Sequence, residues 1–298
     1  MARLLRHTIR TLNRVIRPVD ELLAPRPWSG APPLFLLGAA RSGTTLAYQV
    51  LTQAFRVTYL PRAVNLAPGL THTCFRLLSR RVREAPTSIR SQQGRTPGLL
   101  GPSEAIGFWT PWVDERGPRI DGLARDERAM ALAVHRLQGH LEAPFVVKCV
   151  YLVQAMHILA RVLPDARFVH LVRSPVPAIA SLYHVRSEYA PAWWSLRPPG
   201  SARVSGLSLL DQCVWQHFAV DAMVREALSG LVRERSRTLV YEDLCRDPGN
   251  ELERIRLWLE PMGWKARKNW SPPSLVQSDR VSAELDQRIR ESPEFRHG

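Results

Sequence analysis

The chain of 298 residues lacks the sequence features of membrane proteins, of secreted proteins and of proteins stabilised by a structural metal ion. No apolar stretch approaches the roughly 18 residues of a membrane-spanning helix. The N-terminus is basic, but no apolar segment or cleavage site follows it, so no secretory signal is expected. The cysteines Cys74, Cys149, Cys213 and Cys245 are widely spaced and match neither a zinc site nor a disulfide framework. We therefore expect a globular protein of a reducing, cytoplasmic compartment.

Lysine is also scarce, although the chain is strongly basic. Lys148, Lys265 and Lys268 are the only lysines, whereas Lys and Arg together number 41 against 27 Asp and Glu, a net charge of +14. Such a surface attracts nucleotides, phosphates, sulfated glycans and anionic lipid. The arginines are spread over the whole chain and no nucleic-acid motif is present, so nucleic acid is not expected as a partner. A non-catalytic basic module for nucleic acid or anionic glycans is kept as an alternative class.

The first 24 residues form a basic amphipathic pattern. Arginines recur at spacings of three or four, and apolar residues fall on another helical face: Arg3, Arg6, Arg10, Arg14 and Arg17 against Leu5, Ile9, Leu12 and Ile16. We favour a helix packed on its own domain, and peripheral contact of residues 1–24 with a membrane is the alternative. The chain is thus divided into a helix and Pro-rich linker (1–32), an α/β domain (33–270) and a polar C-terminal tail (271–298).

The strongest signal in the sequence is the stretch 33–46. Residues 33–37 are apolar, which predicts a strand buried on both faces, and a helical pattern begins at Thr44. Strand, glycine-rich loop and helix is the layout of a phosphate cradle, where backbone N–H groups and the helix dipole face an anion. We therefore expect the loop to bind a phosphate group through Gly38, Ala39, Ala40, Arg41, Ser42, Gly43, Thr44 and Thr45.

The positively charged residue of this loop stands at a different position from the lysine of nucleoside-triphosphate enzymes. Gly38 and Gly43 have the P-loop spacing, but Thr44 stands in place of the P-loop lysine, and the cation is Arg41. The stretch from Ala40 to Thr45 resembles the 5′-phosphosulfate loop of the sulfotransferases, although that family usually has proline in place of Ala40. The resemblance implies 3′-phosphoadenosine 5′-phosphosulfate (PAPS) as co-substrate, without a metal. A P-loop kinase that uses ATP is the alternative.

Two further motifs follow in the order of that family. The apolar run 143–150 predicts a buried strand that carries Lys148 near its end, where open α/β sheets bind ligands. The family places this lysine by the transferring sulfuryl group. Residues 167–173 predict a strand that ends at Arg173, followed by a helix with Ser181. The resemblance assigns Arg173 and Ser181 to the 3′-phosphate of PAPS, since an arginine fork matches phosphate oxygens, and Arg186 is a further candidate.

Glu104 is the candidate general base. It follows a turn at 101–103 and precedes small and aromatic residues, so a plain helix N-terminal acid is the alternative interpretation. Members of the resembling family use an acidic residue or a histidine in this region, and a histidine base therefore stays open. Trp193 and Trp194 either line an acceptor pocket or pack a loop on the core.

The last predicted strand spans residues 237–240 and is followed by Tyr241, Glu242 and Asp243. The family places this tyrosine beside the adenosine of the cofactor. Under the kinase alternative Asp243 would instead hold magnesium. The resemblance also implies that the C-terminal tail folds over the cofactor.

Together these motifs predict a single α/β domain with a mostly parallel central sheet flanked by helices, of the P-loop-like sulfotransferase fold. The implied reaction moves the sulfuryl group of PAPS to a hydroxyl or amine of a small-molecule, lipid or glycan acceptor. Glu104 would take the proton of the acceptor, and Arg41 and Lys148 would stabilise the transferred group. The weakly patterned segments 61–143 and 187–207 are expected to shape the acceptor pocket.

Overall fold

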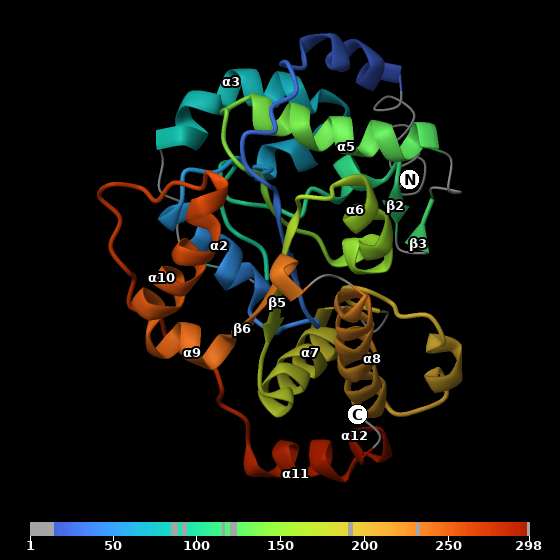
Figure 1. Cartoon of the computed structure of the whole chain (residues 1–298). Coiled ribbons are helices and arrows are strands. Elements are labelled where there is room, and N and C mark those ends of the chain that lie inside the picture. The colour runs from blue at the N-terminus through green and yellow to red at the C-terminus, as the bar shows by residue number, and fades with distance from the viewer. Residues whose placement is uncertain are drawn as a thin grey trace.

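Four parallel strands form the centre of the molecule (Figure 1). The computed structural model describes residues 15–84, 89–90, 94–114, 117–119, 124–189, 193–230 and 233–296. The strands lie in the order β4-β1-β5-β6 and span Leu34–Leu37 (β1), Val146–Lys148 (β4), Arg167–Val172 (β5) and Ser236–Val240 (β6). All three pairings between neighbours are parallel. The predicted α/β class with a parallel central sheet is confirmed.

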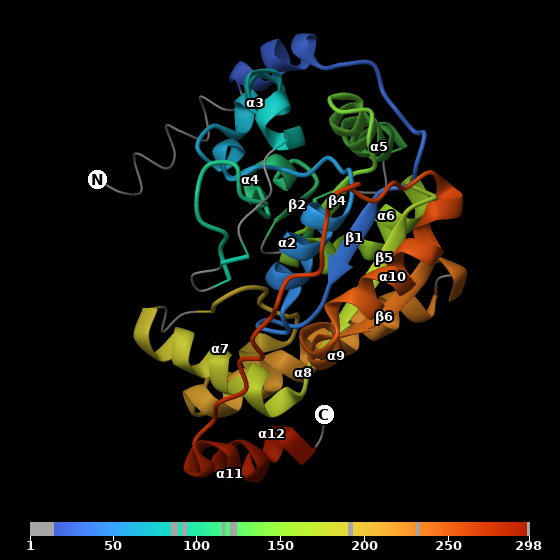
Figure 2. The ribbon, with the colours of Figure 1, turned by 90° about the vertical axis from the view of Figure 1, so that its left-hand side faces the viewer.

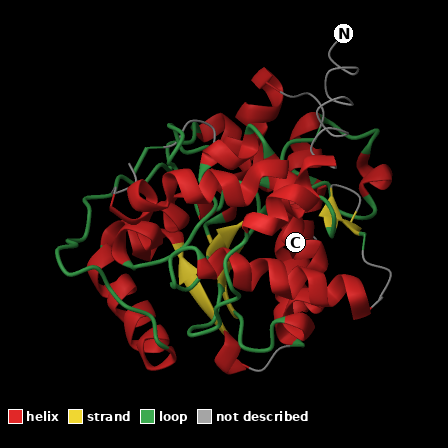
Figure 3. Cartoon of the chain, turned by 90° about the horizontal axis from the view of Figure 1, so that it is seen from above, coloured by secondary structure: helices red, strands yellow, loops and turns green. Residues whose placement is uncertain are grey.

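Helices cover both faces of this sheet (Figures 2 and 3). Phe35 and Leu37 of β1 face one apolar cluster, whereas Leu34 and Leu36 face the other. The first cluster is completed from α4 (Ile106–Trp109), α5 (Ala124–Gly139), α6 (Met156–Val162) and α8 (Leu209–Ser229). The second is completed from α2 (Thr44–Ala54), α9 (Tyr241–Arg246) and α10 (Pro248–Leu259). Because both faces of β1 are buried, β1 is an uninterrupted apolar run, whereas the edge strand β6 carries the exposed Arg237 and Thr238.

The C-terminal residues form more than a polar tail. Residues 271–282 run as an extended segment, and two helices follow, α11 (Ala283–Glu291) and α12 (Pro293–Arg296). Ser282 caps α11 by accepting a hydrogen bond from the backbone N–H of Leu285. Ile289 is fully buried in a third apolar cluster with residues of α7 (Pro175–Tyr189) and α8. The extended segment is therefore anchored at its C-terminal end by α11.

Short elements make up the layer above the sheet. They are η1 (Glu21–Leu23), η2 (Arg62–Asn65), η3 (Pro68–Leu70), α3 (Thr71–Glu84), the β2–β3 pair (Val113–Asp114, Gly117–Pro118) and η4 (Val150–Ala155). The remaining turns are η5 (Ser201–Val204), η6 (Arg233–Arg235) and η7 (Glu260–Met262). Residues 56–61 run beside β4, where the Thr58 N–H donates to the Pro144 carbonyl over 2.8 Å. This segment leads the chain from α2 to η2 along the sheet edge.

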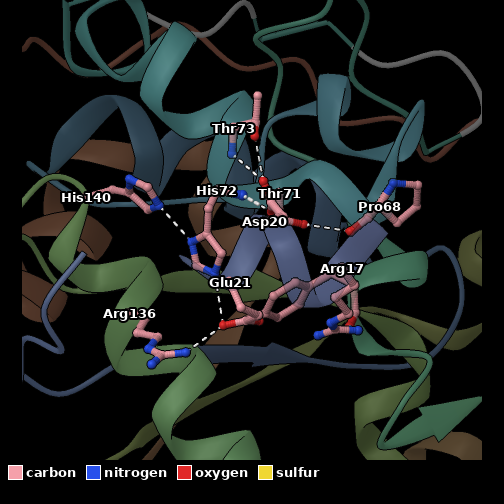
Figure 4. Close-up of polar contacts among 10 residues, drawn as sticks. Arg17, Asp20, Glu21, Pro68, Thr71, His72, Thr73, Arg136 and His140 are labelled. Carbon is pink, nitrogen blue, oxygen red and sulfur yellow. Dashed lines mark hydrogen bonds and ion pairs between the residues drawn. The ribbon is translucent and has the colours of Figure 1, made fainter. Parts of the chain in front are cut away.

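The described part of the N-terminal segment packs on the domain through its polar side chains (Figure 4). Residues 15–20 are helical, and the rest of the predicted helix, 1–14, lies outside the described residues. Asp20 is 3% exposed and accepts hydrogen bonds from the backbone N–H groups of His72 and Thr73 at the start of α3. Glu21 forms an ion pair with Arg136 at 2.6 Å. Within the described residues, no helix combines the length and apolar character needed to cross a membrane.

Candidate active site

A cavity of about 1010 Å³ opens at the carboxyl ends of the parallel strands. Its walls come from the loop after β1, the segments 94–106 and 193–195, the ends of β4 and β5, and residues of α7, α9 and the extended C-terminal segment. The residues predicted for the phosphosulfate loop, the transfer and the 3′-phosphate line this cavity, except Gly38, Ser42 and the further candidate Arg186. Residues spread over two hundred positions of sequence therefore meet in one place.

The loop after β1 has the shape of an anion cradle. Gly43 precedes α2 with φ 91°, and a Cβ atom there would lie 2.3 Å from Cδ2 of Tyr241, so only glycine fits. No side chain caps the N-terminus of α2, which leaves its first N–H groups facing the cavity edge. Ser42 is 1% exposed, and its hydroxyl has no hydrogen-bond partner among the described residues. These uncapped donors fit a phosphate or phosphosulfate group.

Arg41 and Arg173 lie together beside this loop. The Arg41 Nε–H donates to Ser181 Oγ over 2.9 Å, and Arg173 donates to the Arg41 carbonyl over 2.9 Å. The Arg173 guanidinium lies 4.3 Å from the centre of the Tyr241 ring. Burial, and then the positive charge of Arg173, lower the pKa of Arg41. An anion bound between these two neighbouring guanidinium groups would offset their mutual repulsion.

The extended C-terminal segment contacts the same arginine. Arg173 donates to the Ser278 carbonyl and to Asp279 Oδ1, the latter over 2.8 Å. The Ser278 N–H donates to the Tyr241 hydroxyl over 3.2 Å. Arg173 is 8% exposed, so the carboxylate of Asp279 supplies the charge that this buried guanidinium needs.

Glu104 and Lys148 form an ion pair inside the cavity. Their side chains are 23% and 10% exposed, respectively. Lys148 ends β4 beside β1, whereas Glu104 precedes Ala105, the residue before α4, which has a φ of 42°. Glu104 is thus held by a lysine from the sheet and lies before the helix rather than in its first turn. The pair places a carboxylate and an ammonium group at one point of the cavity wall.

Sequence comparison decides the family. The model of the Sulfotransferase family matches residues 32–264. The chain belongs to the sulfotransferase family. A comparison with curated proteins gives no match.

Solved structures of bacterial sulfotransferases resemble this sulfotransferase. STF1 from Mycobacterium tuberculosis is 14% identical, with a TM-score of 0.53, and the match covers 95% of this chain and 76% of that one. STF9 from Mycobacterium avium is 18% identical (TM-score 0.49; 87% and 67% covered). The sulfotransferase domain of the Synechococcus olefin synthase is 19% identical (TM-score 0.44; 79% and 74% covered). The likeness to STF1 supports the predicted sulfotransferase fold.

Two candidates from the sequence lie outside the cavity of the sulfotransferase. Arg186 is 1% exposed and donates to Gln212 and Gln216 of α8, over 2.8 Å and 3.2 Å. It therefore joins α7 to α8 instead of facing a phosphate. Asp243 pairs with Arg246 at 3.0 Å and does not line the cavity. The described residues contain no cluster of three metal-binding side chains.

The structure adds cavity residues that sequence motifs did not identify. Arg62, Asn65, Arg95, Trp193 and Trp194 also line the cavity, and the Arg95 guanidinium lies over the ring of Trp194. The sequence left two roles for the tryptophans, lining the acceptor pocket or packing a loop on the core. In the structure both line the cavity. Arg62 and Arg95 stand in segments without helical or strand periodicity, where no pattern marks the inward side chains.

Proposed function

We propose that this sulfotransferase transfers the sulfuryl group of PAPS to a hydroxyl or amine of a small acceptor. The observation that carries the proposal is the meeting of Arg41, Arg173 and Ser181 at the uncapped start of α2. An arginine fork suits phosphate oxygens, and helix N-terminal N–H groups suit a second anion. This arrangement fits a ligand with two anionic groups, as PAPS has.

The loop Gly38 to Thr45 holds the 5′-phosphosulfate in this proposal, and Arg173 with Ser181 holds the 3′-phosphate. The 3′-phosphate would take the place of the Asp279 carboxylate on Arg173. Tyr241 packs beside Gly43 and under Arg173, where its ring supports the nucleoside. No metal is proposed, because Arg41, Lys148 and Arg173 supply positive charge along the cavity.

PAPS supplies the sulfuryl group, and 3′-phosphoadenosine 5′-phosphate (PAP) is the product. Glu104 accepts the proton that the acceptor hydroxyl or amine loses as its oxygen or nitrogen bonds to sulfur. Lys148 holds the Glu104 carboxylate in place through their ion pair. Lys148 and Arg41 stabilise the charge that develops on the transferred group. A general base contributes roughly 100- to 10,000-fold, and one such cation on the order of 100- to 1000-fold.

A labelling experiment tests this function directly. Purified protein is incubated with radiosulfur-labelled PAPS and a small-molecule extract, and labelled products are separated by chromatography. We expect labelled sulfate esters or sulfamates with the native protein and almost none with Glu104→Gln or Lys148→Met. Labelled product that is unchanged in both variants would contradict the assigned roles. Transfer of labelled phosphate from ATP instead would support a kinase.

The four cysteines are all free, one of them half-buried and the rest buried. Free thiols agree with the cytoplasmic location that we propose for the reaction.

A further inference from the structure

The end of the cavity beside Glu104, where η2 is hydrogen-bonded to residues 101–103, carries positive charge on Arg62 that the proposed transfer does not use. Five cationic side chains line the cavity, against Glu104 as the acidic one. Arg41, Lys148 and Arg173 have roles in the transfer, which leaves Arg62 and Arg95. Neither of these arginines has an acidic partner within ion-pair distance among the described residues. Their charge is therefore available to a ligand.

Backbone contacts fix Arg62 on the wall that carries Glu104. The Arg62 N–H donates to the Gly101 carbonyl over 2.8 Å, and the Ser103 N–H donates to the Leu60 carbonyl over 2.9 Å. Asn65 also donates to Ser103 Oγ over 2.5 Å. Ser103 directly precedes Glu104, so η2 and the proposed base are parts of one wall. An acceptor whose hydroxyl reaches Glu104 would therefore lie near η2, which carries Arg62.

Arg95 stands on the same segment that Arg62 contacts. The Arg62 guanidinium donates to the Thr96 carbonyl over 3.4 Å, next to Arg95 in sequence. The Arg95 guanidinium lies over the ring of Trp194, 5.3 Å from its centre. An arginine stacked on an aromatic ring keeps its fork oriented while its N–H donors remain free for an anion.

Large apolar side chains are exposed at this end of the cavity. Leu66 is 72% exposed, Leu99 57% and Ile106 38%, and all three line the cavity. Exposed apolar side chains gathered beside a site mark a surface that a ligand covers, because burial of such area is favourable. This end therefore combines apolar surface with unpaired positive charge.

We propose that the acceptor is an anionic amphiphile. Its apolar part covers Leu66, Leu99 and Ile106, and its phosphate, sulfate or carboxylate group pairs with Arg62 and Arg95. The inference rests on the proposed function, because the role of Glu104 defines which end of the cavity receives the acceptor. A neutral sugar would leave both the apolar surface and the arginines without partners.

Calorimetry of the PAP-saturated full chain tests the inference with two matched ligands, decyl phosphate and uncharged decyl glucoside, both below their micelle concentrations. We expect decyl phosphate to bind at least about tenfold more tightly, since hydrogen bonds to charged groups are the stronger ones. This preference shrinks as salt is raised. Decanoate in place of decyl phosphate distinguishes a carboxylate-bearing from a phosphate-bearing acceptor.

Variants assign the two parts of the ligand. Arg62→Gln should weaken decyl phosphate about tenfold and leave decyl glucoside unchanged. Leu99→Ser should weaken both ligands to a similar extent. Arg203→Gln is the matched control, because Arg203 is an exposed arginine of η5 outside the cavity. It removes the same charge and should leave both affinities unchanged.

Equal binding of the two ligands, or an Arg62→Gln protein that keeps the full preference for phosphate, overturns the inference. PAP is titrated first and separately. Absence of PAP binding contradicts the proposed function itself, whereas PAP binding without a phosphate preference contradicts only the amphiphilic acceptor.

Discussion

Replacement of Asp279 by asparagine should tighten the binding of PAP. In the ligand-free protein the carboxylate of Asp279 accepts a hydrogen bond from Arg173 over 2.8 Å, at the position assigned to the 3′-phosphate. Phosphate and carboxylate cannot both take the same N–H donors, so the carboxylate must leave before the cofactor product binds. Asp279→Asn has nearly the same shape but removes the charge that competes.

The size of the effect follows from the burial of the pair. The Arg173 side chain is 6% exposed and that of Asp279 is 25% exposed. A hydrogen bond between charged groups contributes about 1.5 to 3 kcal/mol, and partial solvation of Asp279 favours the lower end of this range. Since 1.4 kcal/mol is about a factor of ten in affinity, the dissociation constant for PAP should fall about tenfold. The ligand-free protein should lose a similar amount of unfolding free energy.

Calorimetric titration with PAP and thermal unfolding without ligand measure the two effects. Asp286→Asn is the control, because Asp286 pairs with Arg290 on α11 and does not contact Arg173. That variant should bind PAP as the native protein does. Unchanged or weaker PAP binding by a well-folded Asp279→Asn protein would refute the competition between carboxylate and phosphate.

Four further predictions concern the reaction, the loop and pH. With the acceptor found by radiosulfur labelling, Glu104→Gln should lower kcat roughly 100- to 10,000-fold with PAP affinity unchanged, and equal loss of both would point to misfolding. Lys148→Met should lower kcat on the order of 100- to 1000-fold; a change confined to KM would speak against its role. Gly43→Ala should abolish PAP binding and lower the melting temperature, because its Cβ would lie 2.3 Å from the Tyr241 ring; normal PAP binding would disprove the tight fit. Burial lowers the pKa of His217 to about 4, so its stabilising contribution is complete above about pH 6.5 and is lost toward pH 4, by up to roughly 3 kcal/mol. Urea unfolding should show that His217→Gln flattens this dependence, and an unchanged slope would reject it.

The sheet and the phosphate loop could be predicted because their signals are local. The central strand β1 is a short apolar run, and the loop after it needs glycine at a fixed position, as the φ of 91° at Gly43 shows. Lys148 and Arg173 were placed correctly at strand ends, since carboxyl ends of parallel strands share one sheet edge.

The direction of single side chains and the contacts between distant residues could not be predicted from the sequence. Arg186 lies in α7 like Ser181, but its side chain turns toward α8 and donates hydrogen bonds to two glutamines. The positive charge of Arg186 alone therefore did not indicate a phosphate contact. Asp279 meets Arg173 across 106 positions, and no periodicity links the two. Arg62 and Arg95 lie in irregular segments, where the fold alone decides which residues face the cavity.

Calorimetric titration with PAP in the absence of magnesium tests the central claim most directly. The native protein is compared with Arg173→Ala, and ADP is titrated under the same conditions. We expect PAP to bind tightly without a metal, ADP to bind weakly because it lacks the 3′-phosphate, and PAP binding to collapse in the variant. PAP binding that is absent, or ADP binding that is equally tight and needs magnesium, would contradict the assignment of PAPS as the donor.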